Sequence, residues 1–319
     1  MACRRMAHDR KFRFGVMCSH AASAADFREK ARNAEALGYS TLFVPDHFID
    51  HPLAPMPAMA TAAAVTDTLR IGSLVLGNDY KHPVVLAREA ATLDLLSDGR
   101  LEVGLGAGWM TADYEKAGLE LDRPGVRIDR LEESVAILKG LMADQPCTFH
   151  GKHYTVTDLD GQPKPVQQPH PPFIIGGGGP KILGLGAREA DIVGINANLR
   201  GGVAISDDTA RSMTGVATDE KLARLRAAAG DRFDELEIQS FVGFTNFTDD
   251  RRALAEMMAS AFGVAPEEAL EIPVVLAGTL EEMIDDVYTR RERWGMSYVV
   301  VGVDVMEQFA PAVARLAGT

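Results

Sequence analysis

The 319-residue sequence has few cysteines, a shortage of basic residues and no long apolar segment. Its three cysteines, Cys3, Cys18 and Cys147, are odd in number and far apart, so they predict neither a disulfide framework nor a zinc site. Lysine and arginine total 33 against 45 aspartates and glutamates, and the net charge of −12 argues against nucleic acid or an anionic membrane as a partner. No run of 18 apolar residues is present and the start of the chain is polar, so we expect a cytoplasmic protein without a membrane span.

Short β-branched apolar segments alternate with amphipathic helical segments, which is typical of repeated βα units around a parallel sheet. The predicted strands are residues 12–18, 41–44, 69–76, 101–105, 173–175, 191–195, 236–244 and 298–303. The predicted helices are residues 24–37, 83–96, 127–142, 180–187, 219–229, 249–262, 280–294 and 305–316. Eight strands, nearly all followed by helices, favour an α/β fold of the closed (β/α)8 TIM-barrel type over an open doubly wound sheet.

Two segments interrupt this alternation. Residues 147–172 are rich in proline, glycine and glutamine, and residues 196–215 are polar, rich in glycine and without periodicity. We expect the second to be a mobile loop over the C-terminal mouth of the barrel. No repeat or low-complexity segment divides the chain, so we expect one domain over residues 1–319, with residues 1–11 as an N-terminal tail.

Glycines and polar residues gather after four successive predicted strands. They are Asp46 and His47 after the second strand, residues 77–80 after the third, residues 104–109 after the fourth and residues 176–179 after the fifth. Because function in (β/α)8 barrels lies where strands end and βα loops begin, these four loops predict one shared site.

The run Gly176, Gly177, Gly178 and Gly179 precedes Pro180, which is well placed as the first residue of a helix. Four glycines suggest that the backbone bends tightly or approaches a ligand closely. The N–H groups at the start of the following helix form a plausible phosphate cradle. The alternative is a flexible βα turn without a ligand.

A second glycine pattern, Gly104-x-Gly106-x-Gly108, resembles a dinucleotide fingerprint only weakly, because the third glycine is misplaced and the strand is the fourth. We interpret it as a turn of small residues that clears space beside a planar ring. The alternative is a tight turn at a corner of the barrel.

His47 follows Asp46 at a strand end, and because histidine titrates near neutrality it is the candidate for passing a proton during hydride transfer. Asp46 is a candidate for hydrogen bonding to a cofactor or to the neighbouring backbone. The alternative is that Asp46 caps a turn and His47 packs without proton transfer. His20, His47 and His51 lack a third-ligand spacing, and prolines at positions 52, 55 and 57 disfavour a helix there, so no metal is expected.

Three segments together resemble the luciferase-like monooxygenase superfamily, and most closely its coenzyme F420-dependent oxidoreductases. Residues 68–109 read TLRIGSLVLGNDYKHPVVLAREAATLDLLSDGRLEVGLGAGW, residues 35–47 read EALGYSTLFVPDH, and residues 171–194 read PPFIIGGGGPKILGLGAREADIVG. The resemblance covers residues 12–317 and is strongest over the first 195 residues.

The resemblance implies a barrel that binds coenzyme F420 or FMN with the ring at the C-terminal mouth. Asp46 and His47 match the pair that faces the ring. Val75, Leu76, Gly77 and Asn78 match a bulge beneath the ring, with a non-prolyl cis peptide placed at Val75–Leu76. Positions lining the ring edge and the phosphate are matched by Ala107, Gly108, Gly176, Gly177, Gly178 and Gly179.

Trp109 stands where sugar-phosphate dehydrogenases of this family carry an acid, so we expect its stacking face to favour an apolar or conjugated substrate. The function that the resemblance implies is F420-dependent hydride transfer with His47 as the catalytic residue. The alternative is a two-component monooxygenase that uses reduced FMN, and a third possibility is a flavin carrier without turnover. Family resemblance also implies a homodimer.

Overall fold

A computed structural model describes residues 10–199, 201–202 and 206–319. Residues 1–9 of the expected tail, and residues 200 and 203–205 of the expected mobile loop, lie outside the described part. Contacts within the chain define two compact units. We call residues 17–36 and 40–176 the His47 unit, and residues 10–16, 37–39 and the described residues of 177–319 the C-terminal unit. The expectation of one domain over the whole chain stays a prediction.

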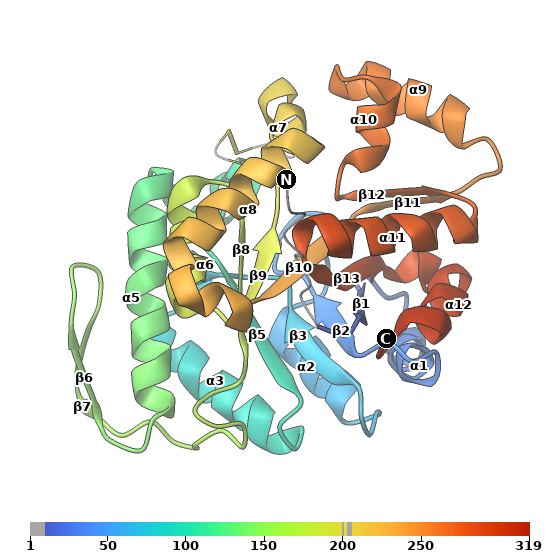
Figure 1. The fold of residues 1–319 in the computed structure, drawn as a ribbon. Coiled ribbons are helices and arrows are strands. Elements are labelled where there is room, and N and C mark those ends of the chain that lie inside the picture. Colours follow the sequence, from blue (N-terminus) through green and yellow to red (C-terminus); the bar gives the residue numbers. More distant parts are fainter. Residues whose placement is uncertain (1–9, 200, 203–205) are drawn as a thin grey trace. The chain divides into compact units, whose positions relative to one another are not determined.

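The His47 unit contains parallel strands with helices between them (Figure 1). Neighbouring parallel pairs are β2 with β3, β3 and β4 with β5, and β5 with β8. The strands are β2 Thr41–Val44, β3 Arg70–Ser73, β4 Leu76–Gly77, β5 Leu101–Gly106 and β8 Phe173–Gly177, the last residue of which belongs to the C-terminal unit. The helices are α1 Ala24–Ala36, α2 Pro55–Ala63, the 3-10 turn η1 Asn78–Tyr80, α3 Pro83–Leu96, α4 Thr111–Ala117 and α5 Pro124–Met142.

The C-terminal unit has four neighbouring strands in the order β1, β13, β10, β9. A separate parallel pair, β11 with β12, lies beside α9 and α10 (Figure 1). The strands are β1 Arg13–Met17, β9 Ile192–Ile195, β10 Glu237–Val242, β11 Phe244–Phe247, β12 Val275–Gly278 and β13 Met296–Gly302. The helices are α6 Pro180–Glu189, α7 Asp207–Arg211, α8 Gly215–Ala229, η2 Gly230–Glu235, α9 Arg251–Phe262, α10 Pro266–Glu271, α11 Leu280–Trp294, η3 Val303–Val305 and α12 Met306–Leu316.

Local sequence signals explain several helix ends. Pro83 occupies the first turn of α3, where the N–H that proline lacks has no intrahelical partner. In α11 a capping box pairs Thr279 with Glu282, and the helix stops at Gly295, which adopts a φ of +71° that glycine tolerates. These ends coincide with the predicted helices 83–96 and 280–294.

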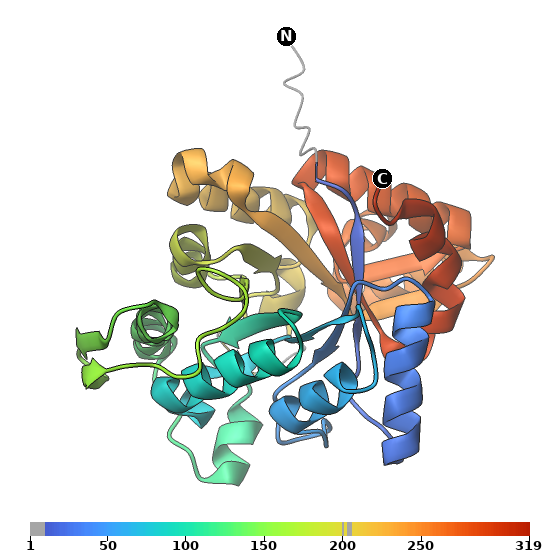
Figure 2. The same ribbon diagram turned by 90° about the horizontal axis from the view of Figure 1, so that it is seen from below.

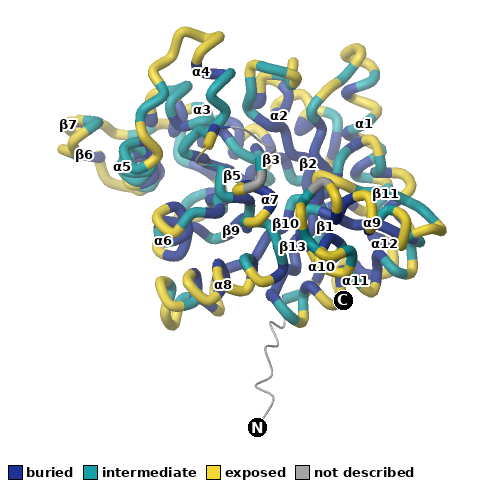
Figure 3. Tube along the Cα trace, turned by 90° about the horizontal axis from the view of Figure 1, so that it is seen from above, coloured by how far each residue is buried: buried dark blue, intermediate teal, exposed yellow. Residues whose placement is uncertain are grey.

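The core of each unit lies between its strands and its helices (Figures 2 and 3). β2 and β5 are buried along their whole length, and so are the first six residues of β13. Strands covered on both faces read as continuous apolar runs, which is why these segments were predictable.

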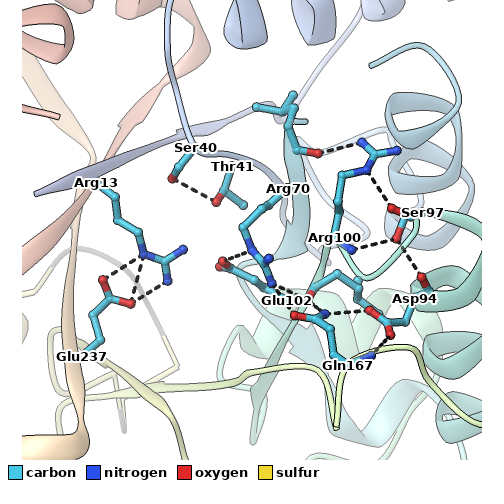
Figure 4. A network of polar contacts seen from close by, with 12 residues as sticks. Arg13, Ser40, Thr41, Arg70, Asp94, Ser97, Arg100, Glu102, Gln167 and Glu237 are labelled. Carbon is cyan, nitrogen blue, oxygen red and sulfur yellow. Dashed lines mark hydrogen bonds and ion pairs between the residues drawn. The ribbon is translucent and has the colours of Figure 1, made fainter. Parts of the chain in front are cut away.

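A polar network holds the starts of two strands in the His47 unit (Figure 4). Arg70 Nε donates to the fully buried Glu102 at 2.7 Å, and its guanidinium also donates to Gln167 at 2.9 Å. The side-chain amide of Gln167 donates in turn to the buried Asp94 at 2.7 Å. In the C-terminal unit, Arg13 makes a comparable paired contact with Glu237 (Figure 4). Removing one partner of such a pair is costly, because it leaves the other group buried without its hydrogen bonds.

The structure differs from the predicted elements in four places. Residues 147–172 contain the antiparallel hairpin of β6 Cys147–His150 and β7 Thr155–Leu159. The predicted strand 69–76 is divided into β3 and β4, and the predicted strand 236–244 is divided between β10 and β11, which have different partners. The described part of residues 196–215 contains α7. Helix α2 starts at Pro55 with both prolines in its first turn, where proline is tolerated, so the expectation that they disfavour a helix was wrong from position 55 onward.

Candidate active site

Asp46 and His47 lie in the loop that follows β2, as predicted from the strand end. The carboxylate of Asp46 accepts a hydrogen bond from the backbone N–H of Gly77 at 3.0 Å and so joins this loop to the loop after β4. Burial raises the pKa of Asp46, and the hydrogen bond from Gly77 opposes that rise in part. Asp46 therefore contacts backbone in this structure, and a hydrogen bond from Asp46 to a cofactor stays a prediction.

His47 is paired with a carboxylate that the sequence did not single out. Nδ1 of His47 lies 2.6 Å from Oδ2 of Asp113, in the first turn of α4. Asp113 is fully buried, and its second oxygen accepts the backbone N–H groups of Phe48 at 3.0 Å and Ile49 at 3.2 Å. One buried carboxylate therefore holds both the imidazole and the chain that follows it.

Aromatic rings surround the imidazole of His47. The ring of Trp109 stands edge-on to it with centroids 5.6 Å apart, and the ring of His51 lies 5.3 Å away. The side chain of His47 keeps 19% of its surface exposed, so it is accessible from outside the protein core. The structure thus brings the predicted proton-transfer residue and the predicted substrate-pocket residue side by side.

The loop between β3 and β4 forms the expected bulge. The peptide bond between Leu74 and Val75 is cis, one residue before the position expected from the resemblance. A Cβ atom on Gly106 would lie 2.6 Å from a methyl group of Val75, and one on Gly104 would collide with the carbonyl oxygen of Ser73. These two glycines therefore make room for the bulge itself, which differs from the sequence interpretation that they clear space for a ring.

Gly77 and Gly108 are also constrained by protein groups. A Cβ on Gly77 would lie 2.5 Å from the ring of Tyr80, and one on Gly108 would collide with the hydroxyl of Tyr114. Gly108 has a φ of +74°, which a side chain would disfavour. The buried guanidinium of Arg127 donates to the carbonyl oxygens of Ala107 and Gly108. These hydrogen bonds hold the backbone at two of the predicted cofactor positions.

Asn78 is buried at the start of η1 and borders an open, polar hollow of about 480 Å³. Arg130 forms ion pairs there with Asp79 and with Asp122, and Asn78 donates to the hydroxyl of Tyr154 at 3.5 Å. The hollow is lined by Asn78, Asp79, Tyr80, Lys81, His82, Asp122, Arg130, His153 and Tyr154. Arg130 is thus paired with both carboxylates of the lining, and Lys81 pairs with Glu89 outside it, which suits a structural role for much of this wall.

The glycine run divides into positions with different surroundings. Gly176 ends the His47 unit, and Gly177, Gly178 and Gly179 lead into α6 in the C-terminal unit. Added Cβ atoms on Gly177 and Gly178 would collide with Ile182 and with the carbonyl oxygen of Asn196. Among the described residues, the nearest atom to a Cβ on Gly179 is Oδ1 of Asn198 at 3.9 Å. Packing within the chain thus explains Gly177 and Gly178, and Gly179 alone of these three leaves open space at the N-terminus of the helix.

Sequence reasoning missed Asp113, Tyr114 and Arg127. Asp113 and Tyr114 fall in a helix of seven residues that was not predicted, and their partners are far away in the sequence. A usable signal is their position four and five residues after Trp109, at the start of the helix that follows the β5 turn. Within the described part of the chain, no group of three or more His, Cys, Asp or Glu side chains is arranged to hold a metal ion. No described helix is long and apolar enough to cross a bilayer.

Comparison with known proteins decides the family. The sequence matches the luciferase-like monooxygenase family over residues 10–298. The chain belongs to this family. Its fold is that of F420-dependent tetrahydromethanopterin reductase from Methanopyrus kandleri, with a TM-score of 0.76, 17% identity and coverage of 97% of this chain and 99% of that one. This likeness confirms the predicted (β/α)8 TIM-barrel class.

Curated relatives of both cofactor types are similar in sequence. FMNH(2)-dependent dimethylsulfone monooxygenase of Pseudomonas putida is 28% identical over 62% of this chain. F420-dependent glucose-6-phosphate dehydrogenase of Amycolatopsis mediterranei is 32% identical over 52% of this chain. In each case the chain spans 51% of the relative's length, about half. The family therefore includes curated relatives that use reduced FMN and relatives that use F420, and this chain is similar to both kinds.

Proposed function

We propose that this chain is an F420-dependent oxidoreductase that transfers a hydride between the deazaflavin and a small apolar or conjugated organic substrate. The observation that carries the proposal is the accessible imidazole of His47, held by the buried Asp113 and flanked by Trp109. Hydride transfer to or from a carbon next to oxygen or nitrogen needs a matching proton transfer, and a held imidazole provides it. Trp109 offers an apolar face for the substrate.

The start of α6 has room for the phosphate of a cofactor. The N-terminus of α6 follows Gly179, where an added Cβ would lie 3.9 Å from its nearest described neighbour, so the backbone there leaves room for a ligand. A helix N-terminus attracts anions through its N–H groups and its dipole. Within the proposal, Gly177, Gly178 and Gly179 hold the phosphate, and the backbone of Val75, Leu76 and Gly77, together with Asn78, Ala107 and Gly108, lines the ring.

A bound deazaflavin supplies the hydride donor or acceptor and, because carbon replaces the reactive flavin nitrogen, activates oxygen poorly. The protein's own part is to hold the substrate against Trp109 and to exchange one proton at His47. Asp46 fixes the loop that carries His47 by accepting the N–H of Gly77. The similarity to the dimethylsulfone monooxygenase supports a second candidate, a monooxygenase that uses reduced FMN.

Cofactor binding distinguishes the two candidates. Purified protein is titrated with F420 and with FMN in separate experiments, and quenching of the cofactor's fluorescence gives the dissociation constants. We expect micromolar binding of F420 and binding of FMN at least about tenfold weaker. Preference for FMN would favour the monooxygenase, and absence of binding by both would overturn both candidates and the carrier hypothesis as well.

A pair of variants tests the phosphate position in the same titration. Gly179→Asp places a negative charge at the open N-terminus of α6 and is expected to weaken F420 binding at least about tenfold. Gly118→Asp adds the same charge at an exposed glycine that has no described neighbour within 4 Å. Its φ is +70°, a conformation that aspartate enters more readily than most residues, and the variant is expected to bind like the wild type. Equal affinity in both variants would place the phosphate elsewhere.

The homodimer and the cytoplasmic location implied by the resemblance and the composition belong to the same proposal. Light scattering of the purified chain at several concentrations measures the first. A mass corresponding to one chain at all concentrations would contradict the dimer without affecting the proposed chemistry.

A further inference from the structure

We propose that Asp113 is a positioning residue that fixes the tautomer of His47, so that Nδ1 carries the proton and Nε2 is the nitrogen that exchanges a proton with the substrate. The assignment of the tautomer stands on the contacts of these two residues. The step in which Nε2 meets a substrate rests on the proposed function.

The contacts of the Asp113 carboxylate determine where the imidazole proton lies. An ionised carboxylate can only accept hydrogen bonds, and one oxygen of Asp113 already accepts the N–H groups of Phe48 and Ile49. The other oxygen lies 2.6 Å from Nδ1 of His47, a distance at which the nitrogen must supply the hydrogen. A neutral imidazole has one N–H group, so Nε2 is left with its lone pair.

The surroundings of His47 oppose a rotation of the ring that would exchange its two nitrogens. Trp109 and His51 lie within 5.6 Å and 5.3 Å of the imidazole centroid. The hydroxyl of Tyr80 donates to Oδ2 of Asp113 at 3.4 Å, and this is the oxygen that accepts from His47. Two side chains therefore hold this carboxylate oxygen. Asp113 has no exposed surface, so water does not compete for its oxygens.

The consequence for proton transfer follows from the tautomer. When a substrate hydroxyl or amine is oxidised, its proton passes to the lone pair of Nε2, and His47 becomes a cation next to the Asp113 carboxylate. In the reducing direction the same proton returns from Nε2 to the substrate. Asp113 touches neither the substrate nor the proton in transit, and it acts by orienting and charge-stabilising His47.

Asp113→Asn separates this role from a purely structural one. The amide oxygen of asparagine can still accept the N–H groups of Phe48 and Ile49, which preserves the loop. Its NH₂ group then faces Nδ1 of His47 and can only donate, so the imidazole proton must move to Nε2. The variant is therefore expected to keep its fold and to invert the tautomer.

The test is a long-range ¹H–¹⁵N correlation spectrum of the full chain labelled in histidine, recorded without cofactor above the pH at which the His47 signal titrates. The chain has eight histidines, and the His47 signals are assigned by their loss in His47→Gln. In the wild type we expect Nδ1 as the protonated and Nε2 as the unprotonated nitrogen, and in Asp113→Asn the reverse. Tyr80→Phe removes the hydroxyl that donates to Oδ2 of Asp113 at 3.4 Å. This variant is expected to retain the wild-type pattern.

A wild-type spectrum with the proton on Nε2 would overturn the proposal even if the variant failed to fold, and so would an unchanged pattern in Asp113→Asn. With a turned-over substrate, Asp113→Asn is expected to lower kcat about a hundredfold or more while KM stays within about threefold. Failure of F420 to bind would remove the proposed function and leave the tautomer assignment standing. An inverted tautomer with unchanged kcat would instead show that His47 exchanges no proton with the substrate.

Discussion

The side chain of Val75 fills the space that a side chain on residue 106 would need. Its methyl group lies 2.6 Å from the position that a Cβ on Gly106 would take. The bulge after β3 and the glycines of β5 are therefore one packing unit, built from residues that are 31 positions apart in the sequence. This relationship is the structural reason for the second glycine pattern.

Gly106→Ala is expected to destabilise the chain by about 1–3 kcal/mol, because the new methyl group overpacks against Val75. The double variant Val75→Ala/Gly106→Ala should recover part of that loss, which urea denaturation of the four members of the cycle measures. Gly302→Ala, where no atom of the described residues lies within 4 Å of the added Cβ, serves as the control and should change stability by less than about 0.5 kcal/mol. Additive effects of the two substitutions would contradict the packing relationship.

His47→Gln is expected to lower turnover by about 10²–10⁴-fold with little change in F420 affinity, because the variant removes a proton-transfer group and retains a polar side chain. Turnover is followed as the change in deazaflavin absorbance with a panel of alcohols and conjugated carbonyl compounds. Unchanged turnover would remove His47 from the chemistry while leaving the fold and the cofactor site as described.

Trp109→Ala is expected to raise KM for an apolar or conjugated substrate about tenfold or more, and Trp109→Phe should retain most of the affinity, because phenylalanine preserves an aromatic face. Initial rates at varied substrate concentrations separate KM from kcat. A change in F420 affinity with an unaltered KM would show that Trp109 contacts the cofactor and not the substrate.

Gln167→Ala is expected to destabilise the chain by about 1–3 kcal/mol, because it leaves Asp94 and Arg70 without one of their buried hydrogen-bond partners. Gln168→Ala, at the neighbouring exposed glutamine, should have an effect below about 0.5 kcal/mol. Chemical denaturation of both variants measures the difference. Equal stabilities would show that the network at the strand starts contributes nothing through Gln167.

Lys221 should make stability depend on pH. Its buried ammonium donates to the carbonyl oxygens of Asn196 and Ser212, and burial lowers the pKa of Lys221 to about 8. In the unfolded chain the pKa is about 10.4, so between these values the unfolded state binds more protons and stability rises with pH. Below pH 8 lysine is charged in both states and the full penalty applies.

The corresponding variant is Lys221→Met, which has no titrating group. The stability of the wild type relative to this variant is expected to increase by roughly 2–3 kcal/mol between pH 8 and 10.5. Urea denaturation of both proteins at pH 7, 8, 9 and 10 measures it. A constant difference across that range would contradict the lowered pKa.

The sequence predicted the parts of the fold that depend on local patterns. Three predicted elements coincide with observed ones: the strand 41–44 with β2, and the helices 83–96 and 280–294 with α3 and α11. Each depends on a local signal, which is a continuous apolar run in β2, a first-turn proline in α3 and a capping box in α11. The hairpin of β6 and β7 was missed, because it has no two-residue turn signal between its strands. Three backbone N–H groups of its turn, from Lys152, His153 and Tyr154, instead bond to Glu133 on α5.

The sequence predicted where the site residues lie along the chain, but it did not predict all of the contacts between them. Asp46, His47 and Trp109 follow strand ends, and the structure gathers them with the bulge of Val75. No sequence pattern identified Asp113 as the partner of His47, since that pairing depends on how α4 packs against the loop after β2. The roles assigned to the site residues in cofactor binding stay predictions.

Gly177, Gly178 and Gly179 have different neighbours, so they differ in the substitutions that they tolerate. Gly177 and Gly178 are locked by Ile182 and Asn196, so a side chain at either position would disturb the barrel wall before it reached any ligand. Gly179 has ordinary dihedral angles and open space, so it tolerates replacement without refolding its neighbours. Under the proposed function, position 179 is where substitution would change which anionic group binds at the α6 terminus while the surrounding packing stays intact.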